Sequence, residues 1–324
     1  MTLFTCTGCD AVLTAPLSRV ALPVHARQRW GHELLGLLME PGTYAVDPHT
    51  SRSPGEIVIT PGDLRGTVMI PANCEAGCCG PGDFGHLNTA CARCGNQVAT
   101  RVDDCGQWQC TWLHPSAVRA VMGPEPAPAP WHRLRELHPG IPAVDLDGVH
   151  HPMWAAAIGE SLAHLLAASH GTPITVPPGP LTGLLRRTLD TLLPRRGPAK
   201  TLVLAGPDLP LRHGGPEVIA LVPRHPQTGL LWHPHDDTPV APLAADVWTY
   251  LTRPDDRLPT PASGTLHRSI HLDHPSPPPA RLGFEPDYAI LLRTLARLPQ
   301  VSEPWLRAAY DRLLRERPYT LHAP

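Results

Sequence analysis

Apolar residues in the second half of the chain recur at the spacings of helices and strands. Residues 153–169 place leucine, isoleucine and alanine near a 3.6-residue period and are followed by Gly171, which predicts a helix. The same criteria predict helices at 181–193, 241–251, 287–298 and 303–317, and strands at 172–176, 201–205, 217–222 and 229–232. Strands interspersed with helices predict a mixed α/β domain with a core of its own.

The first half has shorter runs that are richer in β-branched residues. Residues 56–60 and 66–70 flank the turn sequence 61–65, and this pattern predicts a β-hairpin. Short strands are also expected at 3–5, 11–13 and 97–100, a short apolar helix at 31–39, and a helix at 115–122 that starts with proline and ends at Gly123.

Alternating prolines at 123–130 favour polyproline II, which cannot form a core element, so a linker is expected there. At 324 residues the chain exceeds a typical single domain. The expected fold class is α+β or mixed α/β. It consists of a β-rich zinc-binding domain with a large insert at 1–122 and an α/β domain of unknown role at 131–324. No run of eighteen apolar residues occurs, so no membrane-spanning helix is expected.

Two short cysteine pairs, Cys6-Thr-Gly-Cys9 and Cys91-Ala-Arg-Cys94, have the spacing with which one tight turn directs two thiolates at a tetrahedral zinc ion. Gly8 and Gly95 can take the positive φ angles that such turns use. At these motifs the chain resembles a zinc ribbon. The resemblance implies a zinc-binding fold and no particular activity. It departs from a compact ribbon because 81 residues separate Cys9 from Cys91, so a folded insert is expected.

The remaining five cysteines predict a possible second zinc site. Cys74 with Cys78 or Cys79, and Cys105 with Cys110, would form another four-thiolate set; we take Cys79 as the ligand. The two sets would then alternate along the chain, which resembles the interleaved cross-brace of RING-like domains. The connectivity stays open, and His86 or His114 could replace a cysteine in either shell.

Other uses of the cysteines are less favoured. The chain starts without a basic and apolar leader, so a cytoplasmic location is expected, and a reducing compartment favours metal over disulfides. The spacing matches neither ferredoxin run of an iron-sulfur protein. The adjacent Cys78 and Cys79 fit a spare thiol beside a metal site better than a redox pair.

Charge favours a protein partner over nucleic acid. Residues 1–122 carry eight arginines against ten carboxylates, a balance of −2, and each four-thiolate zinc site adds −2. A local patch of Arg19, Arg27 and Arg29 beside Trp30 is the exception. The favoured function is an interaction or regulatory module without catalytic activity.

The alternative is a metal-dependent hydrolase-type enzyme in the second half, of unknown substrate. Its site would lie at His233, His235 and Asp237, or around His271, Asp273 and His274, since histidine and aspartate suit zinc or manganese. The first cluster departs from the His-x-His-x-Asp-His loop because Thr238 replaces the last histidine. No Gly-rich phosphate loop, Gly-x-Ser-x-Gly or His-Glu-x-x-His motif is present in that half.

Overall fold

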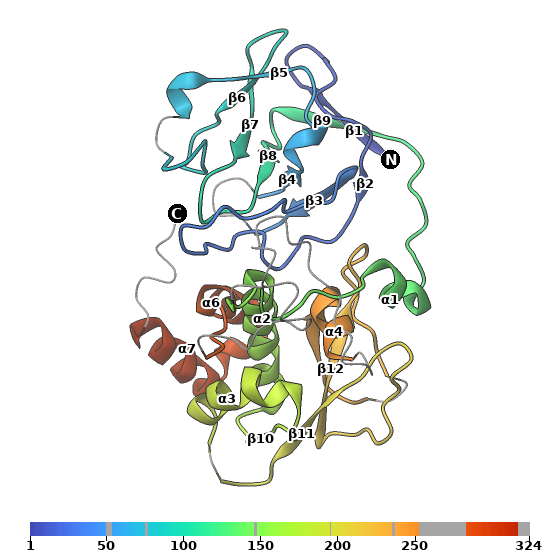
Figure 1. Ribbon diagram of the computed structural model, residues 1–324, viewed down its shortest axis with the longest axis vertical. Coiled ribbons are helices and arrows are strands. Elements are labelled where there is room, and N and C mark those ends of the chain that lie inside the picture. Colours follow the sequence, from blue (N-terminus) through green and yellow to red (C-terminus); the bar gives the residue numbers. More distant parts are fainter. Residues whose placement is uncertain are drawn as a thin grey trace, which may run out of the picture. The chain divides into compact units, whose positions relative to one another are not determined.

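The computed structural model describes residues 1–49, 54–74, 77–145, 148–194, 196–234, 237–252 and 283–316 (Figure 1). It contains 28% helix and 24% strand in several sheets, which confirms the predicted fold class. The chain divides into two compact units. The first holds Met1–Pro128 and Pro226–Gly229, and the second holds Ala129–His225 and the described residues from Leu230 onward. Independent folding of the segments 1–122 and 131–324 stays a prediction.

The first unit is built from two sheets. One has seven strands in the order β2-β3-β4-β8-β7-β6-β5, all antiparallel except the pair β2 and β3. Its strands are β2 (Ser18–Arg19), β3 (Thr43–Asp47), β4 (Glu56–Ile59), β5 (Thr67–Met69), β6 (Thr89–Cys91), β7 (Gln97–Val102) and β8 (Cys110–Leu113). The other pairs β1 (Thr2–Cys6) with β9 (Val118–Met122) in antiparallel orientation. Two 3-10 turns, η1 (Pro61–Asp63) and η2 (Pro71–Asn73), lie on either side of β5.

The predicted hairpin at 56–70 is wrong. The two edges of β4 are taken by β3 and β8, and β5 pairs with β6 instead. Between β4 and β5 the chain makes the 3-10 turn η1, and the Arg65 N–H then donates to the Leu13 carbonyl at 2.7 Å. A turn sequence therefore separates the strands, but their partners come from elsewhere in the chain.

The two helices predicted in this unit are also wrong. Residues 118–122 form β9, whose valines suit the strand opposite β1, in a register from Thr2 and Met122 to Cys6 and Val118. Residues 31–39 form no helix because their backbone pairs with the segment before β8. There the Gly106 N–H donates to the Glu33 carbonyl, and the Gln109 N–H donates to the Gly36 carbonyl.

One arginine ties several strands of the first unit together. The Arg27 guanidinium lies 3.5 Å from the centroid of the Trp112 ring and forms ion pairs with Asp47, Glu56 and Asp83 at 3.2, 2.5 and 3.5 Å. A planar guanidinium suits stacking and several carboxylates at once. Arg27 is thus engaged within the fold.

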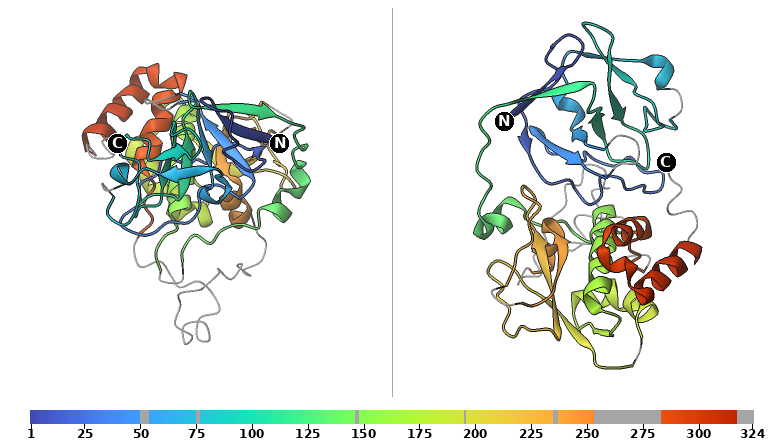
Figure 2. Two further views of the ribbon diagram at one scale, coloured as in Figure 1. Left: turned by 90° about the horizontal axis from the view of Figure 1, so that it is seen from above. Right: turned by 180° about the vertical axis from the view of Figure 1, so that it is seen from behind.

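The second unit contains a four-stranded parallel sheet in chain order, β10 (Ile174–Thr175), β11 (Lys200–Leu204), β12 (Val218–Arg224) and β13 (Val240–Ala244). Its α-helices within the described residues are α1 (Leu134–Leu137), α2 (Pro152–Ser169), α3 (Arg187–Leu192), α4 (Ala245–Leu251), α6 (Tyr288–Arg297) and α7 (Pro304–Glu316). A π-helical segment, η4 (Thr182–Arg186), leads into α3, and η3 (Trp131–Arg133) and η5 (Pro299–Ser302) are 3-10 turns. Figure 2 shows α6 and α7 beside α2, with which α6 is in contact.

Most elements predicted in the second unit are confirmed, including the helices α2, α6 and α7 and the strands β10, β11 and β12. Residues 241–251 are wrong in part, because the run begins as β13 and turns helical at Ala245. Residues 229–232 form only an isolated bridge, between Leu231 and Arg224. A buried apolar run such as β13 reads alike as helix or strand when its partner is unknown.

Both faces of the parallel sheet are covered. Ile219 and Leu221 of β12 belong to the large core that includes α2 and α6, while Ala220 and Val222 belong to a smaller cluster. Strands buried on both faces are expected of parallel sheets. Among the described residues, no helix combines the length and apolar character needed to cross a bilayer.

Candidate metal centre

The first cysteine pair sits on a tight turn at the end of β1. The Cys6 N–H donates to the Ala11 carbonyl at 2.9 Å, and the Asp10 N–H donates to the Cys6 carbonyl at 2.9 Å. Asp10 adopts a left-handed conformation, with φ of 57°. Aspartate tolerates this region better than most residues, which allows the chain to reverse directly after Cys9.

The second pair repeats this turn between β6 and β7. The Cys91 N–H donates to the Asn96 carbonyl at 2.8 Å, and the Gly95 N–H donates to the Cys91 carbonyl at 2.9 Å. Gly95 takes the place of Asp10, with φ of 74°. The positive φ expected of Gly95 is therefore present.

Gly8 has another role than the expected one, since its φ is not in the left-handed region. A Cβ at Gly8 would lie 3.4 Å from the Cys94 sulfur and 3.7 Å from the Cys6 sulfur. The glycine instead leaves space for the facing sulfur atoms. Its N–H also points to the Cys6 sulfur at 3.4 Å, as do amides in metal-thiolate turns.

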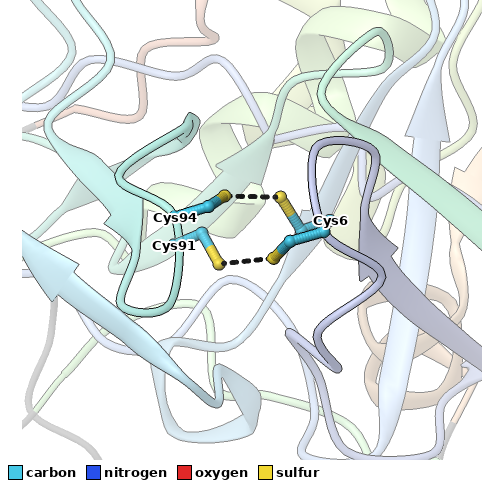
Figure 3. A group of neighbouring side chains, drawn as sticks. Cys6, Cys91 and Cys94 are labelled. Carbon is cyan, nitrogen blue, oxygen red and sulfur yellow. Dashed lines mark hydrogen bonds between the residues drawn. The ribbon is translucent and has the colours of Figure 1, made fainter.

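The two turns bring their four sulfur atoms together (Figure 3). Cys6 and Cys94 have sulfurs 3.6 Å apart, as have Cys9 and Cys91, and all four atoms lie within 4.8 Å of one another. Tetrahedral zinc with bonds of about 2.3 Å places its sulfurs about 3.8 Å apart, whereas a disulfide needs about 2.05 Å. Cys6, Cys9, Cys91 and Cys94 thus form a group that could hold a metal ion.

The electrostatics of this group favour a cation. Burial opposes ionisation of Cys6, but the Gly8 N–H, the Asn96 amide and the neighbouring thiols outweigh it and lower the Cys6 pKa to about 7. At Cys94 the Asn96 N–H favours the thiolate, yet the Cys9 thiol and burial outweigh this and raise the Cys94 pKa to about 12. Adjacent sulfurs compete for negative charge, and a bound dication relieves that competition.

Residues that follow β4 join the two turns. Arg65 donates its N–H to Leu13, just beyond the first turn, and Gly66 accepts from the Ala92 N–H, within the second turn, at 2.9 Å. Gly66 has φ of 55°, and a Cβ there would lie 3.0 Å from the Val12 carbonyl. The insert between the cysteine pairs therefore helps to set their separation.

The predicted second set is brought together in part. Cys79 and Cys105 lie in one group with Cys78, all sulfurs being within 4.8 Å of one another, and this group also could hold a metal ion. Cys74 and Cys110 lie outside it: the Cys74 thiol donates to the Ile70 carbonyl at 3.3 Å, and burial raises the Cys110 pKa to about 12. All nine cysteines are free thiols.

The histidines named with these cysteines belong to neither group among the described residues. The His114 Nδ1 lies 2.9 Å from the Ser116 hydroxyl, and His86 is exposed. A different histidine, His32, lies near Cys105, at 3.8 Å from Nδ1 to Sγ. No local spacing signals it, because 72 residues separate it from Cys105.

The candidate site for an enzyme has little support. His233 and Asp237 are exposed and join no group of metal-ligating side chains among the described residues. His235, His271, Asp273 and His274 lie outside the described residues.

The second unit contains an ion pair between a buried carboxylate and a half-buried arginine that the sequence did not predict. Glu160 of α2 and Arg224 of β12 approach to 2.7 Å. Burial raises the pKa of Glu160 against the opposing effect of Arg224, and burial together with Arg224 lowers the pKa of His164 to about 4. The pair joins a helix to the sheet, which accounts for it without a ligand.

Comparisons with protein-family models, with curated proteins and with solved structures give no match for this chain.

Alanine substitutions at two glycines test whether the second cysteine turn requires a left-handed residue. Gly95 and Gly36 both have open space where an added methyl group would lie, but only Gly95 has a left-handed φ. We expect Gly95→Ala to lower the free energy of unfolding of the protein by about 1–2 kcal/mol, and Gly36→Ala to change it by a few tenths of a kcal/mol. Urea unfolding measures both. Equal losses in the two variants would contradict the assignment of strain to Gly95.

Proposed function

We propose that the first unit is a zinc-stabilised interaction or regulatory module whose four-cysteine centre holds a structural zinc ion and whose surface binds a protein partner. The observation that carries this proposal is the convergence of four thiols from two turns separated by 81 residues. Two matching turns with facing sulfurs are what a tetrahedral ion requires of a backbone.

The donor set supports zinc and a structural role. Four thiolates favour zinc or iron among the common metals, and zinc needs no redox partner. A shell of four protein ligands leaves no position for water or substrate, so such an ion stabilises the fold instead of catalysing a reaction. Cys6 and Cys91 are 0% exposed and belong to the core of the unit, which joins the centre to the packing of the sheets.

The edge of the seven-stranded sheet supports a protein partner. Strand β5 is the terminal strand of that sheet, and its Val68 and Met69 are 52% and 37% exposed. A terminal strand with exposed apolar side chains can accept a strand of another chain. Thr67 of β5 pairs with the ligand Cys91 of β6, so the centre holds this edge in place.

Charge supports a protein over nucleic acid. Residues 1–122 have a balance of −2, and one four-thiolate zinc centre brings it to −4. Arg27, the middle arginine of the cluster near Trp30, is committed to carboxylates and to an aromatic ring inside the fold. A cytoplasmic location fits the same proposal, because a reducing compartment keeps thiols available for metal.

Metal analysis tests the centre. Cys6→Ser and Cys91→Ser should each lower the zinc content of the purified chain by one ion, because a four-ligand shell loses most of its affinity with one ligand. His233→Ala should leave the zinc content unchanged. Zinc that persists in the cysteine variants, or that is lost in His233→Ala, would favour the hydrolase alternative instead.

Chelation tests the structural role. Because a closed thiolate shell contributes folding free energy directly, a strong chelator should unfold residues 1–122 and leave 131–324 folded. Hydrogen exchange followed by mass spectrometry reports both segments in one experiment. Protection that is lost in both segments, or kept in both, would contradict the proposal.

Photo-crosslinking tests the partner surface. A photoreactive residue at Val68 in cells should give a discrete protein adduct that disappears in the Cys91→Ser background. Val121 of β9 is a matched control, since it is apolar and 48% exposed on another strand of the same unit. Equal adducts at both positions, or adducts with nucleic acid, would argue against a protein-binding edge at β5.

A further inference from the structure

The second cysteine group draws its thiols from two loops. Cys78 and Cys79 precede β6, and Cys105 lies between β7 and β8. Their sulfurs all lie within 4.8 Å of one another. Consecutive residues of a strand point in opposite directions, so the approach of both Cys78 and Cys79 to one point needs a special backbone.

That backbone is a tight turn around a carboxylate. The Asp104 side chain, 6% exposed, accepts the N–H groups of Cys78 at 3.3 Å and Cys79 at 2.7 Å. A Cβ at Gly77 would collide with the Gly80 carbonyl, and a Cβ at Gly80 would collide with the Asp103 carbonyl. Only glycine fits both positions, and the turn delivers two adjacent thiols beside Cys105.

A fourth donor is held beside the same cysteine. The His32 Nδ1 lies 3.8 Å from the Cys105 sulfur. The segment that carries His32 is fixed by two hydrogen bonds, Gly106 N–H to the Glu33 carbonyl at 2.8 Å and Trp30 N–H to the Gly106 carbonyl at 2.9 Å. Gly106 has φ of 70°, and a Cβ there would lie 2.6 Å from the Gly31 carbonyl, so this approach also depends on glycine.

We propose that Cys78, Cys79, Cys105 and His32 bind a second zinc ion in a shell of three thiolates and one imidazole. Three cysteines and one histidine are an established donor set for structural zinc. Zinc bonds of about 2.3 Å to sulfur and 2.0–2.1 Å to nitrogen place a sulfur and a nitrogen donor about 3.6 Å apart, close to the 3.8 Å between His32 and Cys105. His32 lies outside the group of three thiols within 4.8 Å of one another, so its ring must turn towards Cys78 and Cys79 to complete the shell. Compared with the set expected from the sequence, this shell contains Cys78 and His32 in place of Cys74 and Cys110.

This centre differs from the four-cysteine centre in exposure. In the second group Cys78, Cys79 and His32 are exposed and only Cys105 is buried. In the first group Cys6 and Cys91 are buried, Cys9 is half-buried and only Cys94 is exposed. A competing chelator reaches exposed ligands first, so the second ion should leave the protein before the first. The proposal is independent of the partner surface and of the structural role argued above.

Zinc counting on the full chain tests it. The wild-type protein, purified with reductant, should carry two zinc ions. In the presence of a competing chelator, His32→Ala and Cys79→Ser should each carry one zinc ion, because the zinc affinity of the second site falls by at least about 100-fold. Loss of a residue that only hydrogen-bonds to a ligand already lowers metal affinity 10- to 100-fold. Cys74→Ser and His86→Ala are matched controls from the same unit and should keep two.

Cobalt substitution assigns the nitrogen ligand. His32→Cys should keep two ions and add sulfur-to-cobalt charge-transfer absorption, because a thiolate replaces an imidazole. His32→Ala and Cys79→Ser change exposed side chains, so circular dichroism should show both folded, and Cys6→Ser should remove the other ion separately. A wild-type content of one zinc, two ions retained in His32→Ala with an unchanged cobalt spectrum, or loss of an ion in Cys74→Ser would overturn the proposal.

Discussion

The first unit depends on the meeting of four sulfur atoms from turns that are 81 residues apart. Closing a flexible loop of that length costs about 4 kcal/mol in chain entropy, beyond a constant term. Structural zinc in small domains contributes about 10–16 kcal/mol, so a bound ion exceeds this cost. Without it, β1 would be held by its pairing with β9 and by core residues such as Phe4. A two-stranded sheet is marginal by itself, and bridges from Thr2 to Leu17 and from Thr5 to Val12 also hold β1. A bound ion would add the link from the end of β1 to the turn before β7.

The two cysteine groups are placed by the same strand. Cys94 lies just before β7 and Cys105 just after it, and six residues of strand span about 20 Å. Along the chain the cysteines alternate between groups, with Cys6 and Cys9, then Cys78 and Cys79, then Cys91 and Cys94, then Cys105. His32 keeps this order, because it lies between Cys9 and Cys78. Strand β7 thus separates the two cysteine groups, and their interleaving links loops that are distant in the sequence.

Features that depend on local chemistry could be predicted from the sequence, and features that depend on distant partners could not. The spacing of Cys91 and Cys94 and the period of α2 are local, and both are present in the structure. Residues 118–122 were expected to be helical, but they form strand β9 because they pair with β1, more than a hundred residues earlier in the chain. The position of His32 could not be predicted either, because hydrogen bonds between its segment and the distant Gly106 bring it to Cys105. Neither the pairing of β9 with β1 nor the approach of His32 to Cys105 produces a periodic pattern in the sequence.

In the proposed function, metal and partner are connected through the sheet. Thr67 of β5 is paired with Cys91, so the exposed edge is ordered by the strand that carries a ligand. A partner that adds a strand to β5 would bind only the conformation in which β5 is paired with β6. The same conformation positions Cys91 of β6, so it would also bind the ion most tightly. Under that proposal, linkage requires the effect to be reciprocal, so a bound partner would strengthen metal binding by the same factor. The balance of −2 over residues 1–122 would, in that proposal, disfavour a polyanionic partner that needs positive charge on this unit. A strand-adding polypeptide has no such need, because backbone hydrogen bonds carry the contact.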